Sequence, residues 1–421
     1  MRPRRALGKV NRSPGGPAAR AKAGNIAGMS GAAIDRRRTL LVLACGAFAS
    51  QASIRICDAM LPVFARDFGG APTDYAMVVT AFTVAYGLFQ LLYGPMGDRY
   101  GKLRVITAAA AVAALGSLAC ALAADRTMLT LMRFATGAAC AALIPLSLAW
   151  IGDHVDYGER QQVLARFMAG STGGAVFGQV SGGLFADTLG WRPAFAVLAA
   201  ALALASVALA RMPRPAPAAG TVHAMGMRAF ANVLRIGHVR LVLAIVFTEG
   251  ALVFGAMAFA PTYLHVEHGL SVWQAGLAAA GFGLGGLAFA LASPWLVPRL
   301  GQRGTAAFGG ALLLAGLTAL GGPHPGIEAV KCAVAGAGFF SLHNTLQTVA
   351  TQMAPQARGT AIAAFACALF FGQTAGVALV AASLRHVAFG RVFVACGVLV
   401  ALLAAIVAAF VARPAAAAAA G

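Results

Sequence analysis

Residues 94–102 read GPMGDRYGK and join two long apolar blocks of the chain. Gly94 and Gly97 let neighbouring helices approach closely, and Gly101 permits a tight turn. Asp98 can accept hydrogen bonds from the N-terminus of a neighbouring helix, where the helix dipole favours a negative charge. A loop that only marks the cytoplasmic side of a membrane needs basic residues and nothing more. The acid and the glycines therefore predict a further role for this loop.

The stretch has a second, altered copy 200 residues later, where residues 294–302 read PWLVPRLGQ. A second pair of related stretches reads FGQVSG at 177–182 and FGQTAG at 371–376, which are 194 residues apart. Two repeats with nearly the same offset predict two halves related by an internal duplication. Duplicated halves with matching positions are typical of secondary transporters.

Twelve apolar blocks surround these stretches, each close to the about 20 residues that a helix needs to cross the hydrocarbon core. They predict an all-α membrane protein with 12 transmembrane helices in two pseudo-symmetric six-helix halves. The predicted spans are 39–65, 74–96, 104–124, 127–151, 162–186, 192–210, 240–264, 272–296, 304–322, 327–353, 359–382 and 391–412.

The linkers are short except for one, which begins with a proline-rich run and marks the boundary between the halves. An arginine-rich tail precedes the first span, and translation from Met29 would remove most of it. We expect this tail to be disordered. The predicted organisation is a tail over 1–38, an N-terminal half over 39–210, a cytoplasmic linker over 211–239, a C-terminal half over 240–412 and a tail over 413–421.

Composition excludes a soluble protein, because 60% of the 421 residues are hydrophobic, only 11% are charged, and the mean hydropathy is +0.78. The net charge of +19 does not indicate a nucleic-acid partner, since the basic residues flank apolar blocks without interleaved aromatic residues. With the N-terminus inside, 24 of the 32 Lys and Arg residues fall in cytoplasmic segments, five in outer loops and three within spans. This bias predicts a multi-pass protein of the bacterial inner membrane with both termini in the cytoplasm.

The chain carries no motif that indicates an enzyme. HExxH, GxSxG and the Walker motif GxxxxGK[ST] are all missing from the sequence, so we expect no catalytic site, no ATP-driven pumping and no cofactor. The seven cysteines lie within apolar blocks without a CxxC pair, which predicts packing residues and no metal site. They are Cys45, Cys57, Cys120, Cys140, Cys332, Cys367 and Cys396.

Residues 94–102 resemble the signature loop between helices two and three of the major facilitator superfamily, and the resemblance covers about residues 39–412. It implies that Asp98 and Arg99, with Gly94, Gly97, Gly101 and Lys102, form a latch that holds the halves together in an outward-open state. Asp153, at the end of span four, is the implied third member. The second copy has Pro298 where the first has Asp98, so the predicted latch is asymmetric.

Two further motifs resemble those of proton-coupled members of this family. Arg133 and Gly137 in span four resemble an arginine motif near the proton pathway; the alternative is an arginine that reaches the outer membrane surface. Glycines of span five resemble GxxxGPxxGG of 12-helix drug:proton antiporters, with Gln179 in place of the proline. The alternative for these glycines is a plain helix-packing face. They are Gly170, Gly174, Gly178, Gly182 and Gly183.

Acids within spans are rare and mark functional sites. Asp58 lies in span one and Glu249 in span seven, the first spans of the two halves. A carboxyl group that alternates between water and a dry interior can bind and release a proton in each transport cycle. Arg55 lies three residues before Asp58 on the same helical face, so a purely structural ion pair is the alternative for Asp58. Arg133 completes the set of proton-coupling candidates.

Polar residues of span ten form a stripe of His343, Asn344 and Gln347, which either lines a cavity or forms hydrogen bonds across helices. With Arg55 they are the substrate-cavity candidates. Lys331 and Glu328, three residues apart at the outer end of the span, predict an interfacial ion pair.

These features predict a secondary transporter that uses protons to export an amphipathic, drug-like compound by alternating access. A proton-coupled transporter of a small organic anion stays open as the alternative, with Arg55, Arg133 or Lys331 as counter-charge. A channel has no need for two duplicated halves. The expected partners are the lipid bilayer, protons and the small-molecule substrate, and we expect a monomer.

Overall fold

The computed structural model describes residues 17–212, 227–322, 327–354 and 357–411. Residues 1–16 of the predicted 1–38 tail, all of the predicted 413–421 tail and the proline-rich part of the linker lie outside the described residues. Helices of the first half are α1 (Pro17–Arg55), α2 (Leu61–Phe68), the short η1 (Pro72–Tyr75), α3 (Ala76–Tyr100), α4 (Lys102–Ala121), α5 (Arg126–Cys140), α6 (Leu143–His154), α7 (Tyr157–Thr188) and α8 (Arg192–Ala210). Then follow α9 (Met227–Arg235), α10 (Gly237–Val266), α11 (Val272–Leu320), α12 (Glu328–Ala350), α13 (Arg358–Ser383) and α14 (Phe389–Val411).

Eight helical segments are long and apolar enough to cross a membrane by length and composition. Within the described ranges the twelve predicted spans are nevertheless present, for two reasons. The 49-residue α11 consists of two helices joined at a kink at Gly301. In addition, α1, α7 and α12 carry charged, polar or glycine residues that lower their hydropathy. Short α9 lies in the predicted linker, and α1 begins at Pro17, within the segment predicted to be a disordered tail.

Both copies of the signature loop place a glycine in the left-handed region of φ. Gly101 has φ 91° between α3 and α4, and Gly301 has φ 63° at the kink of α11. Only glycine adopts such angles without steric cost. The duplication seen in the sequence is therefore also present in the backbone, at positions 200 residues apart.

Prolines interrupt two spans of the first half. Residues 56–60 form turns between α1 and α2 in front of Pro62, and residues 141–142 form a turn between α5 and α6 in front of Pro145. A proline ring clashes with the carbonyl four residues earlier and opens the helix there. The first of these breaks contains Asp58.

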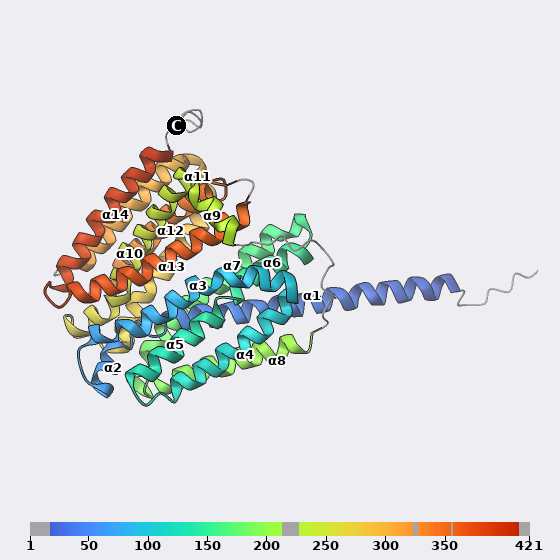
Figure 1. The fold of residues 1–421 in the computed structure, drawn as a ribbon, viewed down its shortest axis with the longest axis horizontal. Helices are drawn as coiled ribbons and strands as arrows, with labels where there is room; N and C mark the ends of the chain where they lie inside the picture. Colours follow the sequence, from blue (N-terminus) through green and yellow to red (C-terminus); the bar gives the residue numbers. More distant parts are fainter. Residues whose placement is uncertain (1–16, 213–226, 323–326, 355–356, 412–421) are drawn as a thin grey trace, which may run out of the picture.

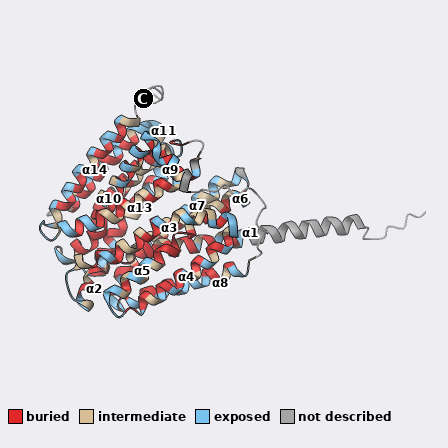
Figure 2. Ribbon diagram, viewed as in Figure 1, coloured by how far each residue is buried: buried red, intermediate tan, exposed pale blue. Residues whose placement is uncertain are grey.

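The two halves diverge toward the end of the bundle where α8 ends and α14 leads to the C-terminus (Figure 1). We call this end, which also carries the Gly101 turn and the Gly301 kink, the terminal side, and the opposite end the far side. Buried residues follow the helix faces that meet other helices (Figure 2). Leu115, Leu204 and Leu291 are 68%, 71% and 77% exposed on outward faces, which suits contact with lipid.

Glycines of α7 bring its backbone against the backbone of α1. A methyl group added at Gly174, Gly178 or Gly182 would collide with the carbonyl oxygens of Phe48, Ala52 and Ile56, respectively. Both sets are spaced by four residues, so one face of each helix meets the other. The second half repeats the arrangement, because added groups at Gly372 and Gly376 of α13 would meet the carbonyls of Phe247 and Ala251 in α10.

We expect Gly178→Ala to lower the free energy of unfolding by about 1–3 kcal/mol, the usual cost of overpacking a filled interior. The measurement is the midpoint of thermal unfolding of the purified protein in detergent. Gly170→Ala is the matched control, because a methyl group there meets nothing within 4 Å. Equal midpoints for the two variants would contradict close packing of α1 on α7.

Contacts between the halves occupy the far side and the middle of the bundle. The most extensive pairs that join them are α7 with α11 and α3 with α13. At the far end, Asp187 accepts a hydrogen bond of 2.6 Å from the backbone N–H of Trp273, and Arg385 Nη2 lies 3.1 Å from Asp74 Oδ1. In the middle, the hydroxyls of Thr83 and Thr374 lie 2.9 Å apart. Cys367 Sγ lies 3.0 Å from the Gly87 carbonyl oxygen.

Candidate functional site

Asp58 lies in the break between α1 and α2 and is 1% exposed. Arg55 Nη1 lies 3.4 Å from its Oδ2 atom, which forms the ion pair that the spacing permits. The other carboxylate oxygen, Oδ1, is buried and has no hydrogen-bond partner among the described residues. The Arg55 guanidinium also lies 4.5 Å from the ring centre of Phe254 in α10, so this pair reaches across to the second half.

Arg133 of α5 is 1% exposed and therefore does not extend to the membrane surface. Its Nη1 donates 2.7 Å to the Ser53 carbonyl, its Nε donates 3.3 Å to the Val78 carbonyl, and its guanidinium lies 4.2 Å from the ring centre of Phe82. The last carbonyls of a helix have no partner within it, and Arg133 satisfies one of those at the end of α1. The remaining Nη2 group has no partner among the described residues.

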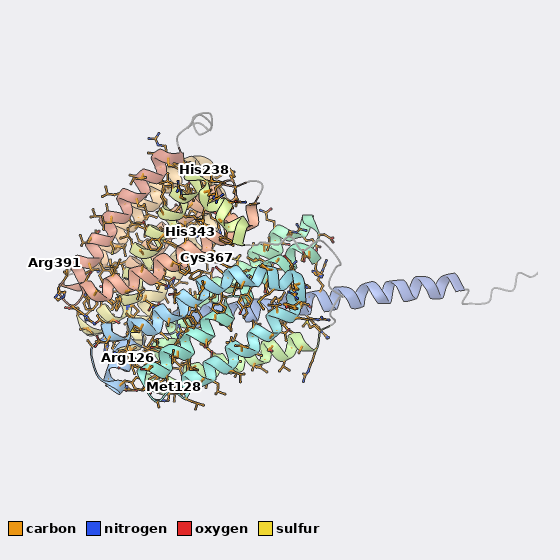
Figure 3. The ribbon with its side chains drawn as sticks, viewed as in Figure 1. Arg126, Met128, His238, His343, Cys367 and Arg391 are labelled. Atoms are coloured by element: carbon orange, nitrogen blue, oxygen red, sulfur yellow. The ribbon has the colours of Figure 1, made fainter. Side chains whose placement is uncertain are left out.

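Glu249 of α10 is fully buried and accepts a hydrogen bond of 2.8 Å at Oε2 from Nδ1 of His343 in α12. Its Oε1 atom is buried without a partner in the described chain. The imidazole of His343 stacks at 5.1 Å on the ring of Phe339, and the ring of Phe365 in α13 lies 5.3 Å away. Figure 3 places His343 and Cys367 in the middle of the bundle, away from both ends.

The predicted stripe on α12 divides between two environments. His343 joins the buried carboxylate, Asn344 is half-buried, and Gln347 is exposed. The structure shows no hydrogen bond from the side chain of Asn344 or Gln347 to another described residue. Of the stripe, only His343 is thus brought together with an acid.

Gln373 of α13 is a buried polar residue that was not predicted as a site residue. It is 1% exposed, its Nε2 group has no partner among the described residues, and its backbone N–H lies near Gly250, the neighbour of Glu249. A signal was present in the repeat, because Gln179 and Gln373 occupy the same place in the two FGQ stretches. Gln179 is also buried, at 6% exposure.

The predicted latch residues lie on the terminal side and interact within their own half. Lys102 Nζ lies 3.9 Å from Asp98 Oδ1 and forms a closer ion pair with Asp153. The guanidinium of Arg99 lies over the ring of Tyr100, 5.2 Å from its centre. Gly97 is buried against Leu146 of α6. In an outward-open state we expect Asp98 to lie near the N-terminus of span eleven, around residues 358–360. The Arg358 side chain lies outside the described part of the chain.

Lys331 lies at the far end of α12, beside the buried Glu328. Its Nζ atom is 3.0 Å from Glu328 Oε1, and both side chains are nearly buried. His268 Nδ1 lies 3.7 Å from the same carboxylate oxygen and His268 Nε2 lies 2.9 Å from the Tyr263 hydroxyl. This cluster is a packed ion pair within the second half.

The buried carboxylates suit proton exchange. Asp58 in the first half and Glu249 in the second are each buried, with a cationic or basic partner and one unpartnered oxygen. Glu328 of the second half, paired with Lys331, shares these features. Burial penalises the charged form of a carboxylate, while a neighbouring cation stabilises it. A change in the separation of the halves would alter both the burial of each carboxylate and its distance from the neighbouring cation. No group of three or more His, Cys, Asp or Glu residues suited to a metal ion occurs in the part of the chain that the structure describes.

Comparison with known proteins decides the family. Residues 43–377 match the sequence profile of the Major Facilitator Superfamily. The chain belongs to this superfamily. Its fold agrees with that of the nucleoside transporter NupG, with a TM-score of 0.73 over 89% of this chain and 99% of that one, at 14% sequence identity.

Two relatives illustrate the range of sequence similarity. The puromycin resistance protein pur8 of Streptomyces alboniger is 34% identical over 160 residues, which are 38% of this chain and 32% of that protein. The uncharacterized MFS-type transporter YceJ of Bacillus subtilis is 25% identical over 328 residues, 76% of this chain and 82% of that one. The similarity to pur8 thus spans about a third of that protein's own length.

Proposed function

We propose that this major facilitator exports a small amphipathic compound in exchange for protons by alternating access. The observation that carries the proposal is the fully buried Glu249 in hydrogen-bond contact with His343, close to the contact between the halves. A buried carboxylate with a titratable partner is a suitable proton carrier, because the two hydrogen-bonded groups titrate as a pair and the pair can gain or lose a proton.

Alternating access supplies the exchange. A carboxylate that is dry in one state and reached by water in the other binds a proton in the first and releases it in the second. A substrate with a basic or polar group that binds to the same Glu249–His343 cluster competes with the proton. Competition for one site gives exchange of substrate for protons, whereas co-transport requires both to bind together.

The direction of transport is supported by the sequence and by one relative. The bias of Lys and Arg toward the terminal side supports a protein of the bacterial inner membrane with both termini in the cytoplasm. The contacts at Asp187 and Arg385 then close the outer face in this state. The name of pur8 connects that protein with puromycin resistance, which favours export of a drug-like compound by this chain, and we expect it to act as a monomer.

A second candidate function is proton-coupled transport of a small organic anion. It is supported by the unpartnered Nη2 group of buried Arg133 and by Arg55, whose side chain is 16% exposed beside Phe254. Either guanidinium is a suitable partner for a carboxylate. Lys331 contributes less to this alternative, because it is paired with Glu328.

The test is transport by the purified protein in proteoliposomes with an imposed pH gradient of either direction. We expect puromycin or another amphipathic cation to move opposite to the protons and accumulate on the acidic side of the membrane. An ionophore that collapses the pH gradient should abolish this accumulation. Accumulation of organic anions alone would establish the second candidate. Transport that is indifferent to the ionophore for every compound of the panel would contradict proton coupling.

Asp98→Asn tests the latch. Replacing the carboxylate weakens the charge-assisted contact of Asp98 with a helix N-terminus in the outward-open state, and so shifts the population toward the state in which the terminal side is open. We expect transport to fall by roughly tenfold, equivalent to about 1.4 kcal/mol, while insertion into the membrane is unchanged. Asp156→Asn is the control, because that side chain is 90% exposed on the same side. Wild-type turnover of the Asp98 variant would exclude the latch.

A further inference from the structure

A groove on the surface of the first half lies apart from the buried acids Asp58 and Glu249. It has a volume of about 490 Å³ and lies between α3, α4 and α5. From α3 the lining takes aromatic and apolar side chains, from α4 mostly alanine and valine, and from α5 alanines. Its lining includes Tyr93 and Tyr100 of α3, Arg104 and Ala108 of α4, and Ala135 of α5.

The groove runs along the helices from the terminal side toward the middle of the membrane. On α4 its lining extends from Arg104 to Val112, a distance of about 12 Å at 1.5 Å per residue. One leaflet of the hydrocarbon core is about 15 Å thick. One turn beyond Val112, Gly116 packs directly against Thr136 of α5 and leaves no space between the helices. The groove therefore has the length of most of one leaflet and a closed inner end.

Charge is concentrated at the outer mouth of the groove. Arg104 is exposed there, and it has no hydrogen-bond or ion-pair partner among the described residues. The nearby acids Asp98 of α3 and Asp153 of α6 both pair with Lys102 and form no ion pair with Arg104. Arg99 lies over the Tyr100 ring at the same mouth. Two guanidinium groups are thus available to an anion at the level of the membrane surface.

We propose that this groove binds an anionic phospholipid, with one acyl chain between α3, α4 and α5 and the phosphate headgroup at Arg104. A membrane-embedded apolar groove is in contact with acyl chains, and a cationic group at its surface end selects the headgroup. Tyr93 and Tyr100 are amphipathic residues typical of the interface between hydrocarbon and headgroups. The bound lipid would lie against the helices that flank the Gly101 turn.

The second half provides an internal comparison. At the offset of 200 residues, Gly304 stands where the first half has Arg104, and Leu300 stands where it has Tyr100. The duplicated position thus lacks both the cation and the aromatic ring at the surface. We infer that the lipid site is specific to the first half and was not required by the shared fold.

The experiment measures lipid binding to the delipidated full-length protein in detergent by native mass spectrometry. The probes are phosphatidylglycerol and phosphatidylcholine with identical acyl chains. We expect phosphatidylglycerol to bind more tightly than phosphatidylcholine, and Arg104→Gln to weaken phosphatidylglycerol binding about fivefold, the effect of one arginine at an anionic surface. Arg211→Gln is the matched control, since Arg211 is exposed at the end of α8 on the same side. Its binding should equal that of the wild type.

Ala108→Phe tests the apolar part, because Ala108 is exposed in the groove and its replacement fills the space without entering the packed interior. We expect this variant to lose phosphatidylglycerol binding while its thermal midpoint in lipid-free detergent stays at the wild-type value. Equal binding of the two lipids to the wild type would overturn the proposal. An equal loss of phosphatidylglycerol binding in the Arg104 and Arg211 variants would also overturn it, because the effect would then come from general surface charge. Unchanged phosphatidylglycerol binding by Ala108→Phe would overturn it as well.

Discussion

Glu249→Gln should abolish transport driven by a pH gradient while substrate exchange without a gradient continues. Glutamine retains the side-chain oxygen that accepts the hydrogen bond from His343 Nδ1, 2.8 Å away, but it cannot bind or release a proton. We expect gradient-driven accumulation to fall by at least about tenfold, equivalent to about 1.4 kcal/mol. The measurement compares accumulation with counterflow of labelled substrate in the same proteoliposomes.

Asp58→Asn and the double variant complete this experiment. Asp58 forms an ion pair with Arg55, so it serves either as a second proton site or as a structural partner. If only Glu249→Gln loses coupling, Asp58 is the structural partner. If both single variants and the double variant still accumulate substrate against a gradient, neither acid carries the proton. Glu267→Gln is the control, because Glu267 is exposed in the turn after α10.

Arg133→Ala should destabilise the protein more than the glycine substitution Gly178→Ala. Removal of the guanidinium deletes two buried hydrogen bonds, to the carbonyls of Ser53 and Val78, and its stacking on Phe82. Hydrogen bonds from a charged donor contribute about 1.5–3 kcal/mol each, so we expect a loss of about 3–6 kcal/mol in the free energy of unfolding. The measurement is unfolding in denaturant followed by fluorescence.

Two further variants distinguish the role of Arg133 from that of any arginine in α5. Arg133→Lys should recover only part of the stability, because one ammonium group lacks the planar fork that reaches two carbonyls and stacks on a ring. Arg126→Ala removes an exposed arginine at the start of the same helix and should leave unfolding unchanged. If Arg133→Ala and Arg126→Ala unfold at the same denaturant concentration, the contacts of Arg133 do not contribute to stability.

The sequence predicts the architecture well, because the signals for it are local. Blocks of apolar residues, the Gly101 turn and its copy at Gly301, and the four-residue spacing of the α7 glycines each follow from neighbouring residues. The Arg55–Asp58 pair is local as well, at a separation of three residues. The prolines that divide spans one and four were also visible, although the resulting breaks were not predicted.

The candidate site is less predictable, because it depends on residues far apart in the chain. Glu249 and His343 are 94 residues apart, and nothing in either span specifies the other as its partner. The polar stripe on α12 was predicted as one unit, yet helix orientation places His343 against an acid and leaves Gln347 exposed. Which face of a span points to the interior depends on packing with other helices, which periodicity within a single span does not determine.

Direct backbone contact between α10 and α13 has a mechanical consequence. Glu249 is followed by Gly250, and a methyl group there would press on Gln373 N and on the carbonyl of Leu369. Two helices that touch through long side chains can shift relative to each other, because rotamer changes absorb part of the displacement. Here the backbone of α10 contacts the backbone of α13 directly, so no side chain lies between them that could change rotamer and absorb a displacement. A movement of α10 of a fraction of an ångström upon protonation would therefore displace α13, and with it the start of that helix on the terminal side, by a similar amount.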